Sequence, residues 1–295
     1  MKIPELMEKI GIAMRMAKIL HLAVESTIEA TIMRETKRRV WWTLYMIDRW
    51  SAAGLGLSRE FHNDCGYPAL PMAEAAFHHM KVNKSEEIGR TQEPGLWAHM
   101  ITLVKVFGQV QDLNQHLAKD DLLGEQVESS VVRIANFLEM YDQELPSNLQ
   151  LNYENLVSHA RQGVGRTFVA LHLGYHHYAT LLYFQFLDTQ RSNSPNRAAY
   201  ADRCKQHAAA FSDLLRLANN EDGCAAVYNI VAHMTIVSSS VLLYTLLFGE
   251  EVELPPARQR LESNFELLIE LNGYWPSVRP MVCFQDHNFL DRSLT

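Results

Sequence analysis

Apolar residues recur at intervals of three and four along most of this chain, the spacing that places side chains on one face of an α-helix. Sustained alternation of apolar and polar residues, the mark of a half-buried strand, is scarce. The pattern therefore predicts an all-α chain folded as an irregular multi-helix bundle. The clearest stripes are Leu6, Ile10, Ala13, Ala17 and Leu20; Leu103, Phe107, Val110, Leu113 and Leu117; Val131, Ile134, Leu138 and Tyr141; Ala201, Cys204, Ala208, Phe211 and Leu215; and Leu261, Phe265, Leu268 and Leu271.

Proline, glycine and polar clusters interrupt these stripes and predict irregular loops near 61–74, 89–95 and 188–197, with a shorter break at 144–148. None of them is long enough to be an interdomain linker. With 295 residues the chain can bury one large core. We therefore predict a single domain over residues 1–295.

The charge balance argues against a nucleic-acid surface. Acidic residues outnumber basic ones by 34 to 27, which gives a net charge of −7. A domain that binds DNA neutralises phosphates with clustered Lys and Arg and is usually basic. We predict no DNA-binding residue in this chain.

The cysteines and histidines do not form a recognisable metal motif. The closest two of the four cysteines, Cys204 and Cys224, lie 20 residues apart, so no C-x-x-C pair is present. His172 and His176 have the i, i+4 spacing of a helical metal site, but no Glu adjoins them. We predict no metal-binding, cofactor-binding or catalytic residue, and reduced, intracellular cysteines.

Other enzyme signatures are incomplete. Residues 120–125 offer only part of the aspartate-rich motif of isoprenoid cyclases, with Gly124 where a third Asp is needed. Gly163-Val164-Gly165 lacks the lysine and the preceding strand of a phosphate-binding loop, and no G-x-S-x-G elbow occurs. We predict that the chain is not an enzyme.

Two uncharged runs, 168–187 and 225–248, are long enough to cross a membrane. Histidines interrupt the first, and Asn229, His233 and a serine triplet interrupt the second. Acidic residues, rather than basic ones, flank the second run. We predict buried core helices and no membrane, with an integral membrane protein as the alternative.

The densest segment of the chain is 35–51, ETKRRVWWTLYMIDRWS. Adjacent tryptophans cannot point the same way on a helix, so we expect this helix to be covered on more than one side. Glu35 and Arg39 have ion-pair spacing, and Lys37-Arg38-Arg39 is typical of a solvated face that pairs with local acids. If Asp48 is buried it needs a partner, which we expect to be a basic side chain from another helix.

This segment resembles the fungal-specific transcription factor domain, the middle homology region that accompanies six-cysteine binuclear zinc clusters. In that family an acid, a run of Arg, two Trp and a downstream Asp-Arg share one helix. Weaker similarities are Met16–Leu20, Leu70-Pro71, Leu171–Tyr175 and Tyr274-Trp275-Pro276, whereas His21–Ala23, Leu55–Ser58 and Asp64 depart from the pattern. The family-signature residues, expected to be structural, are Glu35, Arg38, Arg39, Trp41, Trp42, Tyr45, Asp48 and Arg49.

The resemblance implies a regulatory region in the nucleus that controls transcription by RNA polymerase II and is not itself the DNA-reading part. Its implied partners are coregulators or the transcription machinery, with DNA reached only through an absent N-terminal module. Zinc is expected only in that missing cluster, so the chain is expected to be N-terminally incomplete or to have lost the module. The resemblance also implies a small-molecule effector, for which a cavity among 168–187 and 225–248 is the candidate place, although plain core helices explain those runs as well. The alternative is a helical small-molecule-binding protein or enzyme unrelated to transcription.

Overall fold

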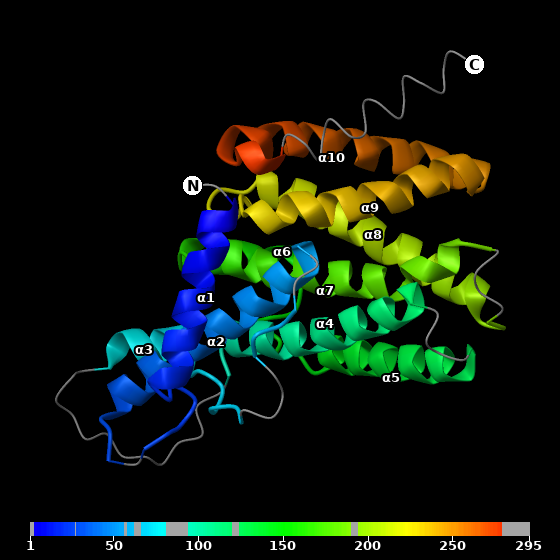
Figure 1. The fold of residues 1–295 in the computed structure, drawn as a ribbon. Coiled ribbons are helices and arrows are strands. Elements are labelled where there is room, and N and C mark those ends of the chain that lie inside the picture. The colour runs from blue at the N-terminus through cyan, green and yellow to red at the C-terminus, as the bar shows by residue number, and fades with distance from the viewer. Residues whose placement is uncertain are drawn as a thin grey trace. The chain divides into compact units, whose positions relative to one another are not determined.

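The computed structural model describes residues 3–26, 28–55, 58–61, 66–80, 94–119, 124–189 and 194–278. These residues form ten α-helices joined by turns and short 3-10 segments, and no strand occurs among them (Figure 1). The prediction of an all-α chain is confirmed.

The ten helices of the described residues differ widely in length. The longest, α2, has 25 residues, and the shortest, α3, has 6. The bounds are α1 Ile3–Ile19, α2 Thr31–Leu55, α3 Glu74–His79, α4 Leu96–Ala118, α5 Gly124–Gln143, α6 Tyr153–Arg161, α7 Gly165–Tyr183, α8 Arg197–Asn219, α9 Asn229–Phe248 and α10 Leu254–Tyr274, with 3-10 turns at Phe184–Leu187, Glu251–Glu253 and Pro276–Val278.

The chain divides into two compact units, residues 1–108 and 109–295, and helix α4 contributes to both. Each unit is described by itself below. The prediction of one domain over 1–295 stays a prediction.

In the first unit, α1 packs on α2. Among the α1 side chains that the structure describes, residues 8–19, Met14 and Ala17 are buried, and the stripe residue Leu6 lies outside this range. Leu20, predicted to continue the stripe, lies beyond the helix end and is 59% exposed. Trp41 and Trp42 of α2 are buried, and the first half of α4 completes the core with Ile101 and other apolar residues.

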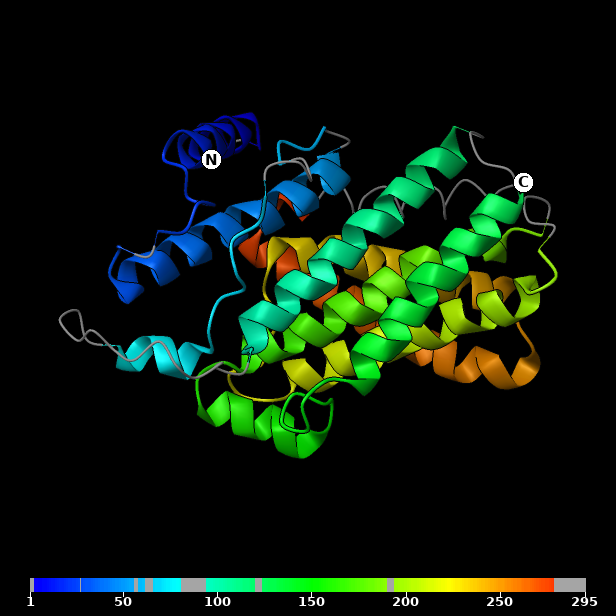
Figure 2. The same ribbon diagram turned by 90° about the horizontal axis from the view of Figure 1, so that it is seen from below.

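In the second unit, α7, α8, α9 and α10 pack in chain order, each on the next, and α5 and α6 pack on α7 (Figures 1 and 2). The predicted stripes of α5 and α8 are buried throughout, which confirms the faces assigned from spacing. Prolines at the first turn of α10 open this helix without loss of a hydrogen bond, because the first N–H groups of a helix have no internal partner.

The two apolar runs form α7 with its 3-10 extension, and α9. Most of α7 is buried in the second unit. Within the described part of the chain, α9 is the one helix whose length and composition would suffice to cross a membrane, and half of that stretch is buried against neighbouring helices. The contacts of both runs are those of core helices.

The predicted irregular segments fall mostly where expected. Residues 144–152 and 188–196 are not helical where described, and 66–73 is likewise irregular. Helices α3 and α8 begin at Glu74 and Arg197, so each enters the last residue of a predicted loop. Most of the predicted loop 89–95 lies outside the described residues.

Candidate functional site

Helix α2 holds the irregular segment 58–73, here called the anchored segment, by hydrogen bonds to its backbone. Residues 62–65 of this segment are outside the described part. Three groups of α2 side chains make these bonds, and every one includes predicted signature residues. All of the atoms involved belong to the first unit.

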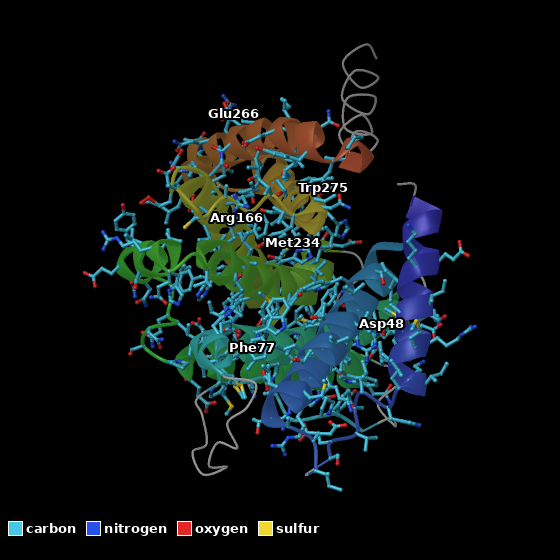
Figure 3. The ribbon with its side chains drawn as sticks, turned by 90° about the vertical axis from the view of Figure 1, so that its left-hand side faces the viewer. Asp48, Phe77, Arg166, Met234, Glu266 and Trp275 are labelled. Atoms are coloured by element: carbon cyan, nitrogen blue, oxygen red, sulfur yellow. The ribbon has the colours of Figure 1, made fainter. Side chains whose placement is uncertain are left out.

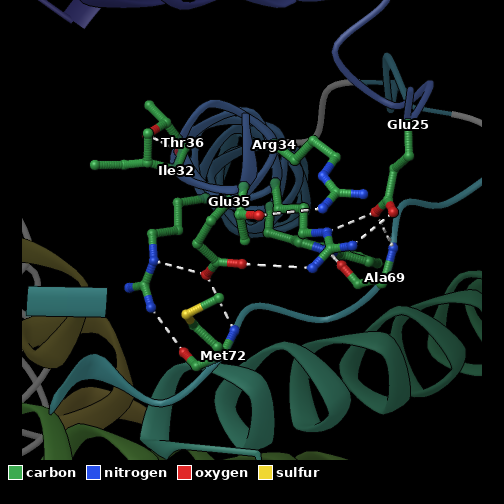
Figure 4. Close-up of polar contacts among 11 residues, drawn as sticks. Glu25, Ile32, Arg34, Glu35, Thr36, Ala69 and Met72 are labelled. Carbon is green, nitrogen blue, oxygen red and sulfur yellow. Dashed lines mark hydrogen bonds and ion pairs between the residues drawn. The ribbon is translucent and has the colours of Figure 1, made fainter. Parts of the chain in front are cut away.

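The first anchor is Glu35, which is completely buried. Its Oε1 accepts hydrogen bonds from Arg39 Nε at 2.9 Å and from the backbone N–H of Met72 at 3.0 Å. Arg39 in turn donates to the Met72 carbonyl at 2.7 Å and lies over the Phe77 ring (Figure 4 for Glu35 and Met72). Both backbone groups of Met72 are therefore bound, and the predicted ion pair of Glu35 with Arg39 is confirmed.

A second acid extends this anchor. Arg38 donates two hydrogen bonds of 2.6 Å to Glu25, and Glu25 also accepts from the Ala69 N–H at 2.9 Å (Figure 4 for Glu25 and Ala69). Burial raises the pKa of Glu35, although Arg39 and Arg38 oppose this, whereas the hydrogen bond from Arg38 lowers the pKa of Glu25. The two acids thus differ because Glu35 is desolvated and Glu25 meets a bidentate guanidinium nearer to water.

The basic run Lys37-Arg38-Arg39 pairs with local acids, as predicted. Lys37 forms an ion pair with Glu29, and the three basic side chains are between 19% and 24% exposed. The expectation of a solvated face needs correction, because these cations lie half-buried between α2 and the chain on either side of it. Their charges are paired with acidic side chains of the first unit.

The second anchor is Trp42, whose indole N–H donates to the Ala69 carbonyl at 3.0 Å. Its fully buried ring stacks on Tyr67 and meets Tyr45 edge to face. The ammonium of Lys105 lies 4.6 Å from the Trp42 ring centre, a cation–π contact, and burial lowers the pKa of this lysine. Aromatic stacking and one hydrogen bond hold the middle of the anchored segment.

The third anchor is the Asp48-Arg49 pair, buried to 3% exposure each. Asp48 accepts from the backbone N–H groups of Glu60 at 2.8 Å and Phe61 at 3.1 Å, and Arg49 donates to the Phe61 carbonyl at 2.9 Å. Asp48 lies on α2 and Phe77 on α3 (Figure 3). The prediction that Asp48 pairs with a basic side chain from another helix was wrong. Its cation is the adjacent Arg49, and its other partners are backbone amides.

From the N-terminal to the C-terminal end of α2, the three anchors bind progressively earlier residues of the anchored segment. Asp48 and Arg49 bind residues 60 and 61, Trp42 binds Ala69, and Glu35 with Arg39 binds Met72. Positions 35 and 48 are about 20 Å apart along a helix axis. The described parts of the segment therefore follow one another in the direction opposite to α2. Side chains hold these parts, because backbone pairing among their described residues is scarce.

Trp41 occupies a different side of the helix from Trp42, as predicted for adjacent indoles. Its ring packs edge to face on Phe61 at 4.6 Å between centroids, and it is 2% exposed. Its buried indole N–H has no hydrogen-bond partner among the described residues. Trp41 thus contributes apolar contact, whereas Trp42 contributes contact and a hydrogen bond.

All eight signature residues take part in this arrangement, and five of them hydrogen-bond backbone groups of the anchored segment. Sequence reasoning missed Glu25, Tyr67 and Lys105, which complete the anchors from outside α2. Glu25 carried a weak signal, since an unpaired arginine run predicts acids nearby. Lys105 and Tyr67 carried none, because their contact with Trp42 exists only in the folded unit.

The two histidines with the i, i+4 spacing, both in the second unit, form hydrogen bonds with other protein groups. His172 donates to the Leu149 carbonyl at 2.9 Å, and His176 shares a hydrogen bond with His207 at 3.1 Å between their Nδ1 atoms. The two residues of the i, i+4 pair thus have different partners. The described residues contain no group of three or more His, Cys, Asp or Glu placed to hold a metal ion.

The fungal specific transcription factor domain family model matches residues 6–162, more than half of the chain and all three anchors. The chain belongs to this family. The step Tyr274-Trp275-Pro276 also lies where the resemblance places it, at the end of the last long helix, and Trp275 donates to the Val227 carbonyl at 2.8 Å.

Curated relatives extend the match beyond the family model. An uncharacterized transcriptional regulatory protein of Schizosaccharomyces pombe is 23% identical over 91% of this chain and 35% of its own length. The Zn(2)-C6 fungal-type transcription factors FTF1c and FTF2 of Fusarium oxysporum f. sp. lycopersici are each 21% identical over 85% of this chain, and over 29% and 25% of their own lengths. The chain therefore spans about a third or less of these relatives. No solved structure matches it.

Proposed function

We propose that this chain is the regulatory module of a fungal transcription factor and that it restrains an activation segment by binding coregulators or the transcription machinery. Membership of the family and the names of the relatives support the link to transcription. In this role the protein acts in the nucleus and carries out no catalytic reaction. It reaches DNA through a zinc-cluster module that would lie outside this chain, and zinc would be bound there.

The anchored segment is the observation that carries the regulatory role. The backbone of this segment is bound at both ends and in the middle by buried side chains of α2. A surface fixed in this way presents one geometry to a partner, and the cost of ordering it is met during folding rather than on binding. We propose that coregulators recognise the face of the first unit that this segment shapes.

A small-molecule effector is a further part of the proposal, taken from the family resemblance. Its place would be among α7 and α9. Beside α9, Ser212 of α8 and Ser238 of α9 bond each other at 2.9 Å, and Asn264 of α10 bonds Ser212 and Ser239 at 3.1 Å. An effector that enters here must replace these internal bonds with its own polar groups, which favours a ligand with hydroxyl or amide groups.

The test is a reporter assay in a fungal host. The chain is inserted between a heterologous DNA-binding domain and a heterologous activation segment and is compared with a flexible linker of equal length. We expect the inserted chain to lower reporter output. Output equal to that of the linker fusion, at equal protein level, would contradict the restraining role.

Signature variants then test whether the anchored segment is responsible. Glu35→Ala removes the bonds to Arg39 and Met72, and we expect it to restore reporter output. Thr36→Ala is the matched control, because among the described residues this neighbouring side chain bonds only the Ile32 carbonyl of its own helix. Circular dichroism of the purified variants separates local release from loss of the fold.

A further inference from the structure

The loop before α8 contains the one Ser-Pro or Thr-Pro dipeptide of the whole sequence, Ser194-Pro195. Proline follows isoleucine, tyrosine, leucine, glutamate, proline, tryptophan or arginine at its other positions. Pro195 and Asn196 are exposed, and Ser194 is half-buried. A kinase that requires proline after its target hydroxyl therefore has a single candidate residue in this chain, at an accessible turn.

The Ser194 hydroxyl takes part in a defined cluster within the second unit. It donates to Glu128 at 2.7 Å, and Asn196 and Tyr200 donate to the other carboxylate oxygen at 2.7 and 2.8 Å. Glu128 belongs to α5, while Tyr200 lies in the first turn of α8. The carboxylate of Glu128 thus ties the beginning of α5 to the loop and to the beginning of α8.

Glu128 is charged in this tie. Burial opposes its ionisation, but hydrogen bonds from Asn196, Ser194 and Tyr200 leave its pKa below the ordinary value. The carboxylate is therefore ionised at neutral pH and accepts from three donors. A second anion at the Ser194 position would lie within hydrogen-bond range of this charge.

We propose that Ser194 is a phosphorylation site for a proline-directed protein kinase and that its phosphate releases the loop and α8 from Glu128. The Ser194 Oγ attacks the γ-phosphorus of ATP, the bond from that phosphorus to the β–γ bridging oxygen breaks, and ADP leaves. The hydroxyl proton passes to the kinase's catalytic base. The product lacks the donor that Glu128 accepts and carries nearly two negative charges beside it.

Two nearby features favour the phosphate rather than oppose it. The N-terminal end of α8 attracts anions, and Arg197, three residues after Ser194, offers a guanidinium. The attraction of a helix end for the phosphate is weaker than the repulsion between a dianion and a carboxylate in direct contact. It therefore does not preserve the tie to Glu128. The two features instead give the phosphate a new position once the old contact is lost.

The first measurement is incorporation of phosphate. The folded 295-residue chain is incubated with ATP and a purified proline-directed kinase, and the product is mapped by mass spectrometry. We expect one phosphate, on Ser194, and none on Ser194→Ala. A peptide of residues 188–200 confirms that the kinase is active. Phosphorylation of the peptide without phosphorylation of the folded chain would overturn the proposal.

The second measurement is amide hydrogen exchange in the first turns of α5 and α8. We expect phosphorylation to accelerate it about tenfold, the factor that accompanies loss of one charged hydrogen bond. In Glu128→Gln the phosphate meets no carboxylate, so the acceleration on phosphorylation should be smaller than in the wild type. Equal exchange in phosphorylated and unphosphorylated wild type, or an acceleration in Glu128→Gln as large as in wild type, would overturn the release.

Discussion

The buried polar side chains of the two units differ in charge and in the groups that they bind. In the first unit, acidic and basic side chains of α2 are buried and bind the backbone of an irregular segment, as Asp48 does for Glu60 and Phe61. In the second unit, the buried polar groups are mostly neutral, and they bond one another or nearby carbonyls within a bundle of regular helices, as His172 and Ser212 do.

The contrast follows from what each backbone needs. A helix satisfies its own N–H and C=O groups, so its core neighbours need supply only shape and a few neutral bonds. An irregular segment leaves these groups without partners, and charged side chains bind them more strongly than neutral ones. The signature of this family is therefore concentrated where backbone regularity is lost.

Acid should destabilise the second unit more than the first. Burial, together with neighbouring cations or histidines, lowers the pKa of His176 and His177 to about 3 and of His172 and His207 to about 4. A histidine whose pKa is lower in the folded state stabilises the fold above its unfolded pKa, near 6.5, and loses this contribution as pH falls. We expect each of these histidines to cost the second unit about 2 kcal/mol between pH 7 and pH 5.

Amide hydrogen exchange, corrected for the intrinsic effect of pH, resolves the two units in one experiment. Protection of α7 and α8 should fall from about pH 6.5 downward, and protection of α2 should fall less over the same range. His177→Phe removes one of the titrating groups and should flatten the slope of the second unit. A parallel decline of both units would contradict the assignment to the buried histidines.

Removal of one anchor should have the next largest effect. Asp48→Ala leaves Arg49 buried without its carboxylate and frees two amides, so we expect a loss of about 3–5 kcal/mol in the free energy of unfolding. Urea denaturation followed by tryptophan fluorescence measures it. Glu60→Ala is the control, because that side chain is 60% exposed and its loss should cost less than about 1 kcal/mol.

The smallest expected effect is the difference in stability between variants of the two adjacent tryptophans. Trp42→Phe leaves the Ala69 carbonyl without its indole donor, whereas Trp41→Phe removes an indole N–H that has no partner among the described residues. Both changes remove similar ring volume, but Trp42→Phe also weakens the contacts with Tyr67 and Lys105, so the difference reports the hydrogen bond together with these contacts. We expect Trp42→Phe to be the more destabilising by about 1 kcal/mol in urea denaturation. Equal losses would show that this anchor is only apolar.

Several features of the fold could be predicted from the sequence. The stripes of α5 and α8 identified their buried faces, and the pairing of Glu35 with Arg39 followed from their separation of four residues. These predictions succeeded because helical geometry relates positions that are close in the chain. The stripe of α1 was less accurate at Leu20, because a helix end is set by local turns that periodicity does not encode.

The contacts between distant segments could not be predicted in this way. The partner expected for Asp48 was another helix, but folding placed the amides of residues 60 and 61 beside it. Neither Tyr67 nor Lys105 carries any pattern that points to Trp42. The sequence by itself determined the helices, their buried faces and the resemblance to a family. Only the tertiary structure decided which backbone groups the signature binds, because an irregular segment has no repeating geometry from which its partners could be read.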